Sequence, residues 1–151
     1  MTNYPSSRAG TQSSMNHRFS KEERLCSKRL IDSLFHNGSS FIMYPYRVVF
    51  LVIDERPHKA EAPAQVIISV PKRRYKHAVD RNLLKRRMRE CYRLQKSKLY
   101  PFLQEHSLHL LIAFQYVGKE KLLSSYLYER MDGVLTKIID ELAKKYVEQT
   151  D

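Results

Sequence analysis

The spacing of hydrophobic residues along the chain predicts an amphipathic helix near each end of its patterned part. The first helix is predicted over residues 27–38, with Ser27 as its N-cap and Gly38 as its stop. Its hydrophobic stripe consists of Leu30, Ile31, Leu34 and Phe35. The last helix is predicted over residues 125–146, where Gly133 should cost ~1 kcal/mol relative to alanine. Its stripe consists of Leu127, Met131, Val134, Leu135, Ile138, Leu142 and Tyr146.

Three apolar runs between these helices predict strands, over residues 46–54, 64–70 and 108–116. The first run is apolar at odd and at even positions, which predicts cover on both faces or one face reserved for a ligand. A further helix is predicted over residues 78–96. The order helix, strand, strand, helix, strand, helix predicts an α/β (α+β) two-layer sandwich, in which helices pack on a small sheet.

Length and composition fit one globular domain. The chain has 151 residues and is 42% hydrophobic, enough for one core. Residues 1–18 are rich in Ser, Thr and Asn, so we expect a disordered N-terminal tail, with Met15 as a candidate start. The single α/β domain is then expected over residues 19–151.

The positive charge is concentrated in one segment. Residues 72–98 contain twelve Lys and Arg and two acids, and so supply +10 of the net charge of +11. The rest of the chain is nearly neutral. A local excess of this kind indicates a binding surface for an acidic polymer rather than a general aid to solubility.

A helical wheel separates the charge of helix 78–96 from its apolar side. Arg81, Lys85, Arg89 and Arg93 form a row at four-residue spacing, with Asn82 and Arg86 beside it. The opposite side collects Val79, Leu83, Leu84, Met88, Cys91 and Leu94. Because like charges at this spacing repel, the row is better explained by a partner that supplies anions, such as the phosphates of a nucleic acid.

Other classes of protein find less support in the sequence. The acids are scattered and the six histidines show no ligand spacing, which disfavours a protein-only nuclease or other hydrolase. The two cysteines form no C-x-x-C pattern, so a zinc site is not expected. No apolar run reaches the ~18 residues that a membrane helix needs, and we expect a soluble, cytoplasmic protein. A non-catalytic RNA or DNA binder remains an alternative, because a basic helix alone would fit it.

The basic segment resembles the signature helix of the bacterial ribonuclease P protein subunit. That signature contains Ala-Val, then Arg-Asn-Arg, then Lys-Arg and a later Arg, which match Ala78-Val79, Arg81-Asn82, Lys85-Arg86 and Arg89. The segments "RLCSKRLIDSLFHNGSS" and "VIISVPKR" resemble the first helix and the strand before the motif. The third position of Arg-Asn-Arg is Leu83 here, and we hypothesise that its cation has moved one turn, to Arg87.

The resemblance implies the protein component of a ribonucleoprotein enzyme that removes the 5′ leader of precursor tRNA. Catalysis would be carried by the RNA subunit with Mg²⁺, and no catalytic residue, metal site or protein partner is implied for this chain. The implied fold is ribosomal protein S5 domain 2-like, a mixed sheet with a left-handed β-α-β crossover. The implied partners are the catalytic RNA and the precursor tRNA leader. The implied RNA-binding residues are Lys72, Arg73, Arg74, Arg81, Asn82, Lys85, Arg86, Arg89 and Arg93.

The resemblance also implies a cleft for the single-stranded leader, between the sheet and the first helix. Stacking of unpaired bases on aromatic side chains would contribute ~1–3 kcal/mol per base. The candidates for its lining are Ile31 and Phe35 from the first helix and Tyr46, Val48 and Phe50 from the first predicted strand. The alternative for all five is burial in the core.

Overall fold

The computed structural model describes residues 19–53 and 62–147, and the predicted tail lies outside them. The long elements begin and end close to where the sequence predicts them. They are helix α1 (Lys28–Asn37), strands β2 (Tyr46–Ile53) and β3 (Ala64–Ser69), helix α2 (Ala78–Gln95), strand β4 (His109–Tyr116) and helix α4 (Ser124–Tyr146). Ser27 caps α1 as predicted, because its Oγ accepts a hydrogen bond from the Leu30 amide at 3.3 Å.

Four short elements were not predicted. They are strand β1 (Ser39–Met43), helix α3 (Tyr100–Glu105) and the 3₁₀ turns η2 (Lys21–Glu23) and η3 (Lys96–Lys98). β1 starts with two exposed serines and contributes only two partly buried side chains, so it carries no strong apolar alternation.

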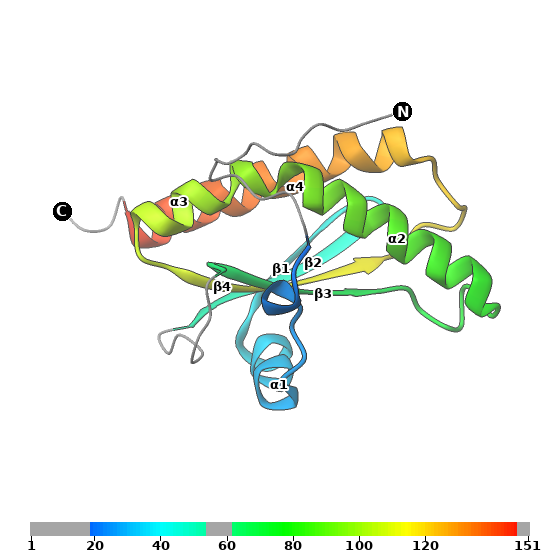
Figure 1. The fold of residues 1–151 in the computed structure, drawn as a ribbon, viewed down its shortest axis with the longest axis horizontal. Coiled ribbons are helices and arrows are strands. Elements are labelled where there is room, and N and C mark those ends of the chain that lie inside the picture. Colours follow the sequence, from blue (N-terminus) through cyan, green and yellow to red (C-terminus); the bar gives the residue numbers. More distant parts are fainter. Residues whose placement is uncertain (1–18, 54–61, 148–151) are drawn as a thin grey trace, which may run out of the picture.

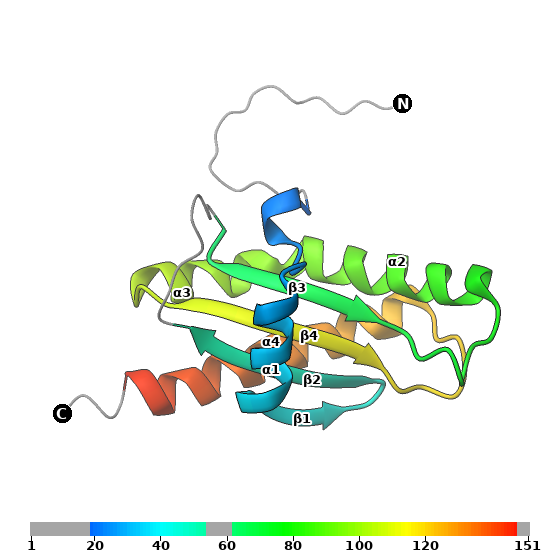
Figure 2. The same ribbon diagram turned by 90° about the horizontal axis from the view of Figure 1, so that it is seen from below.

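The strands form one mixed sheet in the order β1-β2-β4-β3. β1 and β4 both run antiparallel to β2, whereas β3 and β4 run parallel. In Figure 2, β3 and β4 point the same way and α2 connects them behind the sheet, from the upper strand to the lower one. This crossover is therefore left-handed, against the general rule for parallel strands. The predicted fold class is confirmed.

Helices cover both faces of the sheet, but unequally. Figure 1 shows α2 and α4 on one face and α1 alone on the other. The α4 stripe is buried as predicted against β2, β4 and α2, with Leu127, Met131, Val134, Leu135 and Ile138 fully inaccessible. On the opposite face α1 runs across the strands (Figure 2), and its Leu30 and Leu34 pack on Val49, Leu111 and Ala113. Among the described residues, no other helix covers the part of this face beyond α1.

A buried ion pair joins the segment before α1 to the far end of α2. Lys96 Nζ lies 2.6 Å from Glu23 Oε2, and both side chains are only 3% exposed. Tyr100 donates a further hydrogen bond to the same oxygen, and the Ser20 amide donates to Glu23 Oε1 at 2.6 Å. Leu25 follows Glu23 by two residues, and its amide donates a hydrogen bond to the Val66 carbonyl of β3 at 2.9 Å. These contacts fix the position from which α1 starts.

Candidate nucleic-acid interface

α2 rests on the sheet along one narrow stripe. Its buried residues are Leu84, Met88, Cys91, Tyr92 and Gln95. The prediction that Val79 and Leu94 lie on the core side was wrong, because they are 78% and 42% exposed. Val79 belongs to the first turn of α2, which projects past the end of the sheet (Figure 2). Tyr92, which the wheel did not single out, takes the place of Leu94 in the core.

The predicted row of cations occupies the flank of α2 that faces away from α4. Asn82 and Arg86 are exposed, and Lys85 and Arg89 are partly exposed. Arg89 borders a hollow of about 360 Å³ that it shares with Arg24 and with apolar side chains of β3. This flank therefore presents cations along the outer edge of β3, where a polyanion could approach. We call Asn82, Lys85, Arg86 and Arg89 the α2 cationic flank.

The two ends of the predicted row make contacts within the protein. Arg93 Nε donates to Glu90 Oε2 at 3.0 Å, and this hydrogen bond is the main reason that the pKa of Glu90 is lowered. Arg81 Nη1 donates to the carbonyls of Tyr75 and Lys76, both at 2.8 Å. Arg81 thus holds the connection between β3 and α2 in place, in addition to any contact with RNA.

The hypothesis that Arg87 supplies the cation missing at Leu83 does not agree with the position of Arg87. Arg87 donates a hydrogen bond to the Leu122 carbonyl in the connection from β4 to α4. One and two turns later, Cys91 and Gln95 also contact backbone carbonyls of α4, at Ser124 and Tyr128. Arg87 therefore belongs to the side of α2 that faces α4, and it does not extend the α2 cationic flank.

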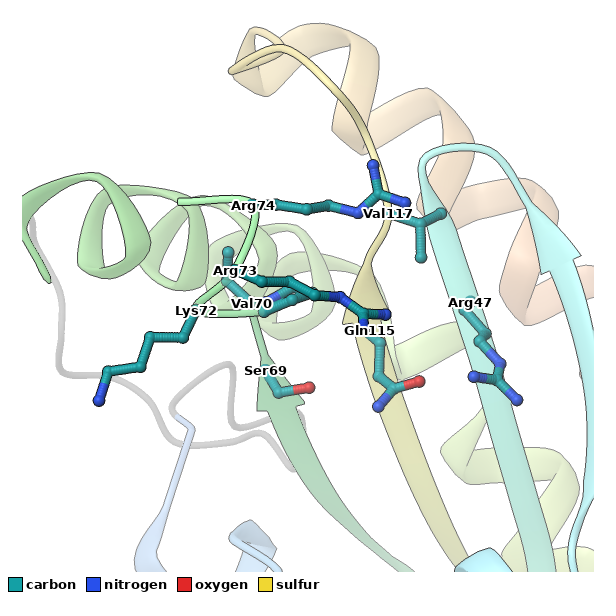
Figure 3. Close-up of a pocket in the computed structure, with 9 residues that line it drawn as sticks. Arg47, Ser69, Val70, Lys72, Arg73, Arg74, Gln115 and Val117 are labelled. Carbon is teal, nitrogen blue, oxygen red and sulfur yellow. The ribbon is translucent and has the colours of Figure 1, made fainter. Parts of the chain in front are cut away.

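A second group of cations surrounds a pocket at the carboxyl ends of β3 and β4. The pocket has a volume of about 390 Å³, and among the described residues its lining includes four cations and no carboxylate. Its floor is one row across the sheet, in which Arg47 and Ser69 both pair with Gln115. The wall is formed by the segment after β3. In Figure 3, Arg73 and Arg74 extend over the strand ends toward Gln115 and Val117, whereas Lys72 points away. We call this site the basic pocket.

The segment that carries these arginines is anchored at its far end. Tyr75 is 8% exposed, its hydroxyl donates to the Gly118 carbonyl at 3.0 Å, and its ring meets Tyr116 edge to face. Arg81 holds the Tyr75 carbonyl from the other side. Both anchors fix the backbone next to Arg73 and Arg74, so the segment that carries these two cations is positioned before any ligand arrives.

The strand side of the predicted leader cleft was assigned to the wrong face. Tyr46 and Val48 are inaccessible and Phe50 is 6% exposed, and all three lie in the core beneath α2 and α4. The face toward α1 instead carries the odd-numbered residues of β2, with Val49 buried by α1 and Arg47 exposed in the basic pocket. Since β2 is apolar at both parities, its sequence did not reveal which set faces α1.

The helix side of the predicted cleft has one exposed phenylalanine. Phe35 of α1 is 47% exposed, so burial in the core does not account for it. Ile31 is partly buried and packs against the small core beneath α1.

Arg47 and Gln115 were not predicted as site residues. A polar residue near one end of each of two largely apolar strands was the signal that could have identified them.

The described residues offer no protein-held metal site and no transmembrane helix. Across residues 19–53 and 62–147, no three His, Cys, Asp or Glu side chains come together as metal ligands do. Within the same ranges, no helix has the length and apolar character to cross a bilayer.

Comparisons with known proteins agree with the fold and with the basic helix. The family model named Ribonuclease P matches residues 19–137. The ribonuclease P protein component of Porphyromonas gingivalis is 43% identical over 101 residues, which cover 67% of this chain and 72% of that relative. The component from Chlorobium phaeobacteroides is 38% identical over 112 residues, which cover 70% of this chain and 76% of that relative.

Two solved structures have the same fold. The RNase P protein of Staphylococcus aureus matches with a TM-score of 0.61 and 20% identity, covering 77% of this chain and 94% of that one. The RNase P protein of Thermotoga maritima matches with a TM-score of 0.60 and 21% identity, covering 76% of this chain and 96% of that one. At these identities the likeness concerns the fold alone.

Proposed function

The chain belongs to the ribonuclease P protein family, and from this we propose that it binds the catalytic RNA of ribonuclease P and the 5′ leader of precursor tRNA. In this proposal the holoenzyme hydrolyses the phosphodiester bond that joins the leader to the tRNA. The single observation that carries the proposal is the α2 cationic flank, a row of cations at the family's signature positions that is turned outward.

The α2 cationic flank is the proposed contact with the catalytic RNA. α2 has 18 residues, and a helix of that length spans about 27 Å, enough to meet several successive phosphates. Arginine can hold a phosphate through two hydrogen bonds, and Asn82 can reach a base edge or a 2′-hydroxyl.

The face of the sheet that α1 only partly covers is the proposed path of the leader. Phe35 offers a ring for stacking on an unpaired base. The row of Arg47, Gln115 and Ser69 follows on the same face and ends at Arg73 and Arg74. Bases can stack at the α1 end of this path while phosphates bind in the basic pocket, which suits a flexible single strand.

Catalysis is assigned in this proposal to the RNA subunit, in the cytoplasm. Mg²⁺, which would stabilise charge on the reacting phosphate, is proposed to be held by the RNA subunit, as the resemblance to the family implies. The protein residues bind and orient the two RNAs. Their cations lower the repulsion between the catalytic RNA and its substrate.

Reconstitution tests the proposed function directly. Adding the protein to the ribonuclease P RNA of the same organism should raise the rate of leader removal most strongly at low Mg²⁺, because protein cations then replace part of the ionic screening. The measurement is single-turnover cleavage of a leader-bearing precursor tRNA across a Mg²⁺ series. If the protein binds structured RNA without stimulating cleavage at any Mg²⁺ concentration, it is a non-catalytic RNA binder and the proposal fails.

Phe35→Ala should weaken binding of leader-bearing substrate by about fivefold or more, since one stacked base contributes ~1–3 kcal/mol. Binding of tRNA without a leader should not change. Holoenzyme affinity for both RNAs, measured with Phe35→Ala and with Phe35→Tyr, which keeps the ring, provides the check. Equal weakening for the two RNAs would show that Phe35 does not contact the leader.

A further inference from the structure

Two exposed tyrosines from distant segments are linked through one arginine at one end of the molecule. Tyr44, in the turn between β1 and β2, is 43% exposed, and Tyr126, in the first turn of α4, is 39% exposed. Arg130 joins them, because its Nε donates to the Tyr44 carbonyl at 2.7 Å and its guanidinium carbon lies 6.0 Å from the centre of the Tyr126 ring. We call Tyr44, Tyr126 and Arg130 the tyrosine platform.

The turn that carries Tyr44 is held in place although Tyr44 itself is exposed. The Tyr44 hydroxyl accepts a hydrogen bond from the Lys119 amide at 3.3 Å, and the carbonyl of the adjacent Pro45 accepts one from the Val117 amide at 2.7 Å. A single exposed aromatic residue needs no explanation. The Arg130 guanidinium lies against the Tyr126 ring and also bonds to the backbone that carries the Tyr44 ring. Two exposed rings on linked segments can stack with flat groups at little cost in entropy.

The platform continues from the basic pocket without an intervening element. Val117 lines the basic pocket, and its amide and that of Lys119 bond to the turn that carries Tyr44. Figure 2 shows the turn between β1 and β2, the segment after β3 and the start of α4 at the same end of the sheet. An extended chain that leaves the basic pocket along the connection from β4 to α4 would therefore reach the platform next.

We propose that the tyrosine platform binds unpaired nucleotides of the leader that lie farther from the cleavage site than those in the cleft. This inference rests on the proposed function. Exposed rings beside a cation suit unpaired bases joined by phosphates, whereas a duplex within the catalytic RNA would present mainly backbone. The platform thus lengthens the stretch of leader that the protein can hold.

Binding to precursor tRNAs whose leaders lengthen by one nucleotide at a time tests the inference. The holoenzyme with Tyr44→Ala and Tyr126→Ala together should bind like wild type while the leader is short. It should lose about fivefold or more in affinity once the leader reaches the platform, as expected for the loss of stacked bases. Tyr126→Phe keeps the ring and should retain the wild-type dependence on leader length.

Tyr128→Ala is the matched control, because Tyr128 is exposed on the same helix to a similar degree, 42%, and its carbonyl faces Gln95 of α2. It should have no effect at any leader length. The inference is overturned if the double variant loses affinity equally for short and long leaders, or loses none while Phe35→Ala does. If wild type itself shows no dependence on the leader, the proposed function fails, and the inference fails with it.

Discussion

Replacing Lys85, Arg86 and Arg89 together by alanine is expected to lower the affinity for the catalytic RNA by about 100-fold at low salt. Each cation should make at least one charge-assisted contact with phosphate, and such a contact contributes ~1 kcal/mol or more. The dependence of affinity on salt should also flatten by about two to three units, because each lost phosphate contact removes ~0.7–0.9 from the slope. Binding isotherms at several salt concentrations measure both quantities.

A matched control removes the same charge elsewhere. Lys137, Lys144 and Lys145 lie on α4, and replacing these three by alanine lowers the net charge equally. This control should reduce affinity far less and leave most of the salt dependence unchanged. If both triple variants behave alike, the protein binds RNA through its net charge, and the assignment of the contact to α2 is wrong. Arg81 is left intact because it also holds the backbone of the segment after β3.

Lys96→Ala is expected to destabilise the fold by ~3–5 kcal/mol. The substitution leaves the Glu23 carboxylate buried without its ion-pair partner, and breaking a buried pair on one side carries a penalty of that size. Replacing both members, as Glu23→Gln with Lys96→Met, should recover a large part of the loss, because no buried charge then remains. Urea unfolding of Lys96→Ala, of Glu23→Gln and of the double variant gives the three free energies of unfolding. A single variant that costs less than ~1 kcal/mol would show that the pair is hydrated in solution.

The same carboxyl group makes a contribution that depends on pH. Burial by itself would raise the pKa of Glu23, but hydrogen bonds from Lys96, Tyr100 and the Ser20 amide outweigh burial and lower this pKa below its ordinary value. A group with a lowered folded-state pKa stabilises the fold above its unfolded-state pKa, and this contribution disappears as the pH falls through the folded-state value. The free energy of unfolding of the wild type should therefore fall more steeply below about pH 4.5 than that of Glu23→Gln.

This network also bears on function, since it fixes the segment from which α1 starts. Glu23 precedes the Leu25 contact with β3 by two residues, and α1 begins at Lys28. Loss of the network should therefore disturb Phe35 as well as stability. Leader affinity of the Glu23 and Lys96 variants is best compared at a temperature where all of them are folded.

The long elements and the basic helix could be predicted because each depends on local pattern. Three apolar runs had the length of strands, three segments had hydrophobic positions at helical spacing, and Ser27 had the chemistry of a helix cap. The row of cations on α2 could be located because like charges on one face of a helix have no benefit for the fold. The short elements β1 and α3 carried too few periodic positions to be recognised.

The identity of the site residues depended more on tertiary contacts. Arg81 and Arg87 have the same chemistry as Arg86, yet they bond to backbone carbonyls of the segment after β3 and of the connection to α4. The helical wheel already separates Arg87 from the row, but nothing within the α2 sequence reveals which backbone carbonyls these two arginines bind. Gly133 illustrates the same limit, since a Cβ there would lie 2.9 Å from Met43 Sδ, so this glycine allows α4 to approach β1 closely.

The sequence by itself thus determined the order and type of the main elements, the stripe that α4 buries and the concentration of positive charge on one helix. Only the tertiary structure decided which face of β2 is buried beneath α2 and α4 and which faces α1. Side-chain period defines two faces for every strand, but a strand that is apolar on both receives its orientation from the helices that pack against it. For the same reason Tyr46, Val48 and Phe50 became core residues, and Arg47 came to line the basic pocket.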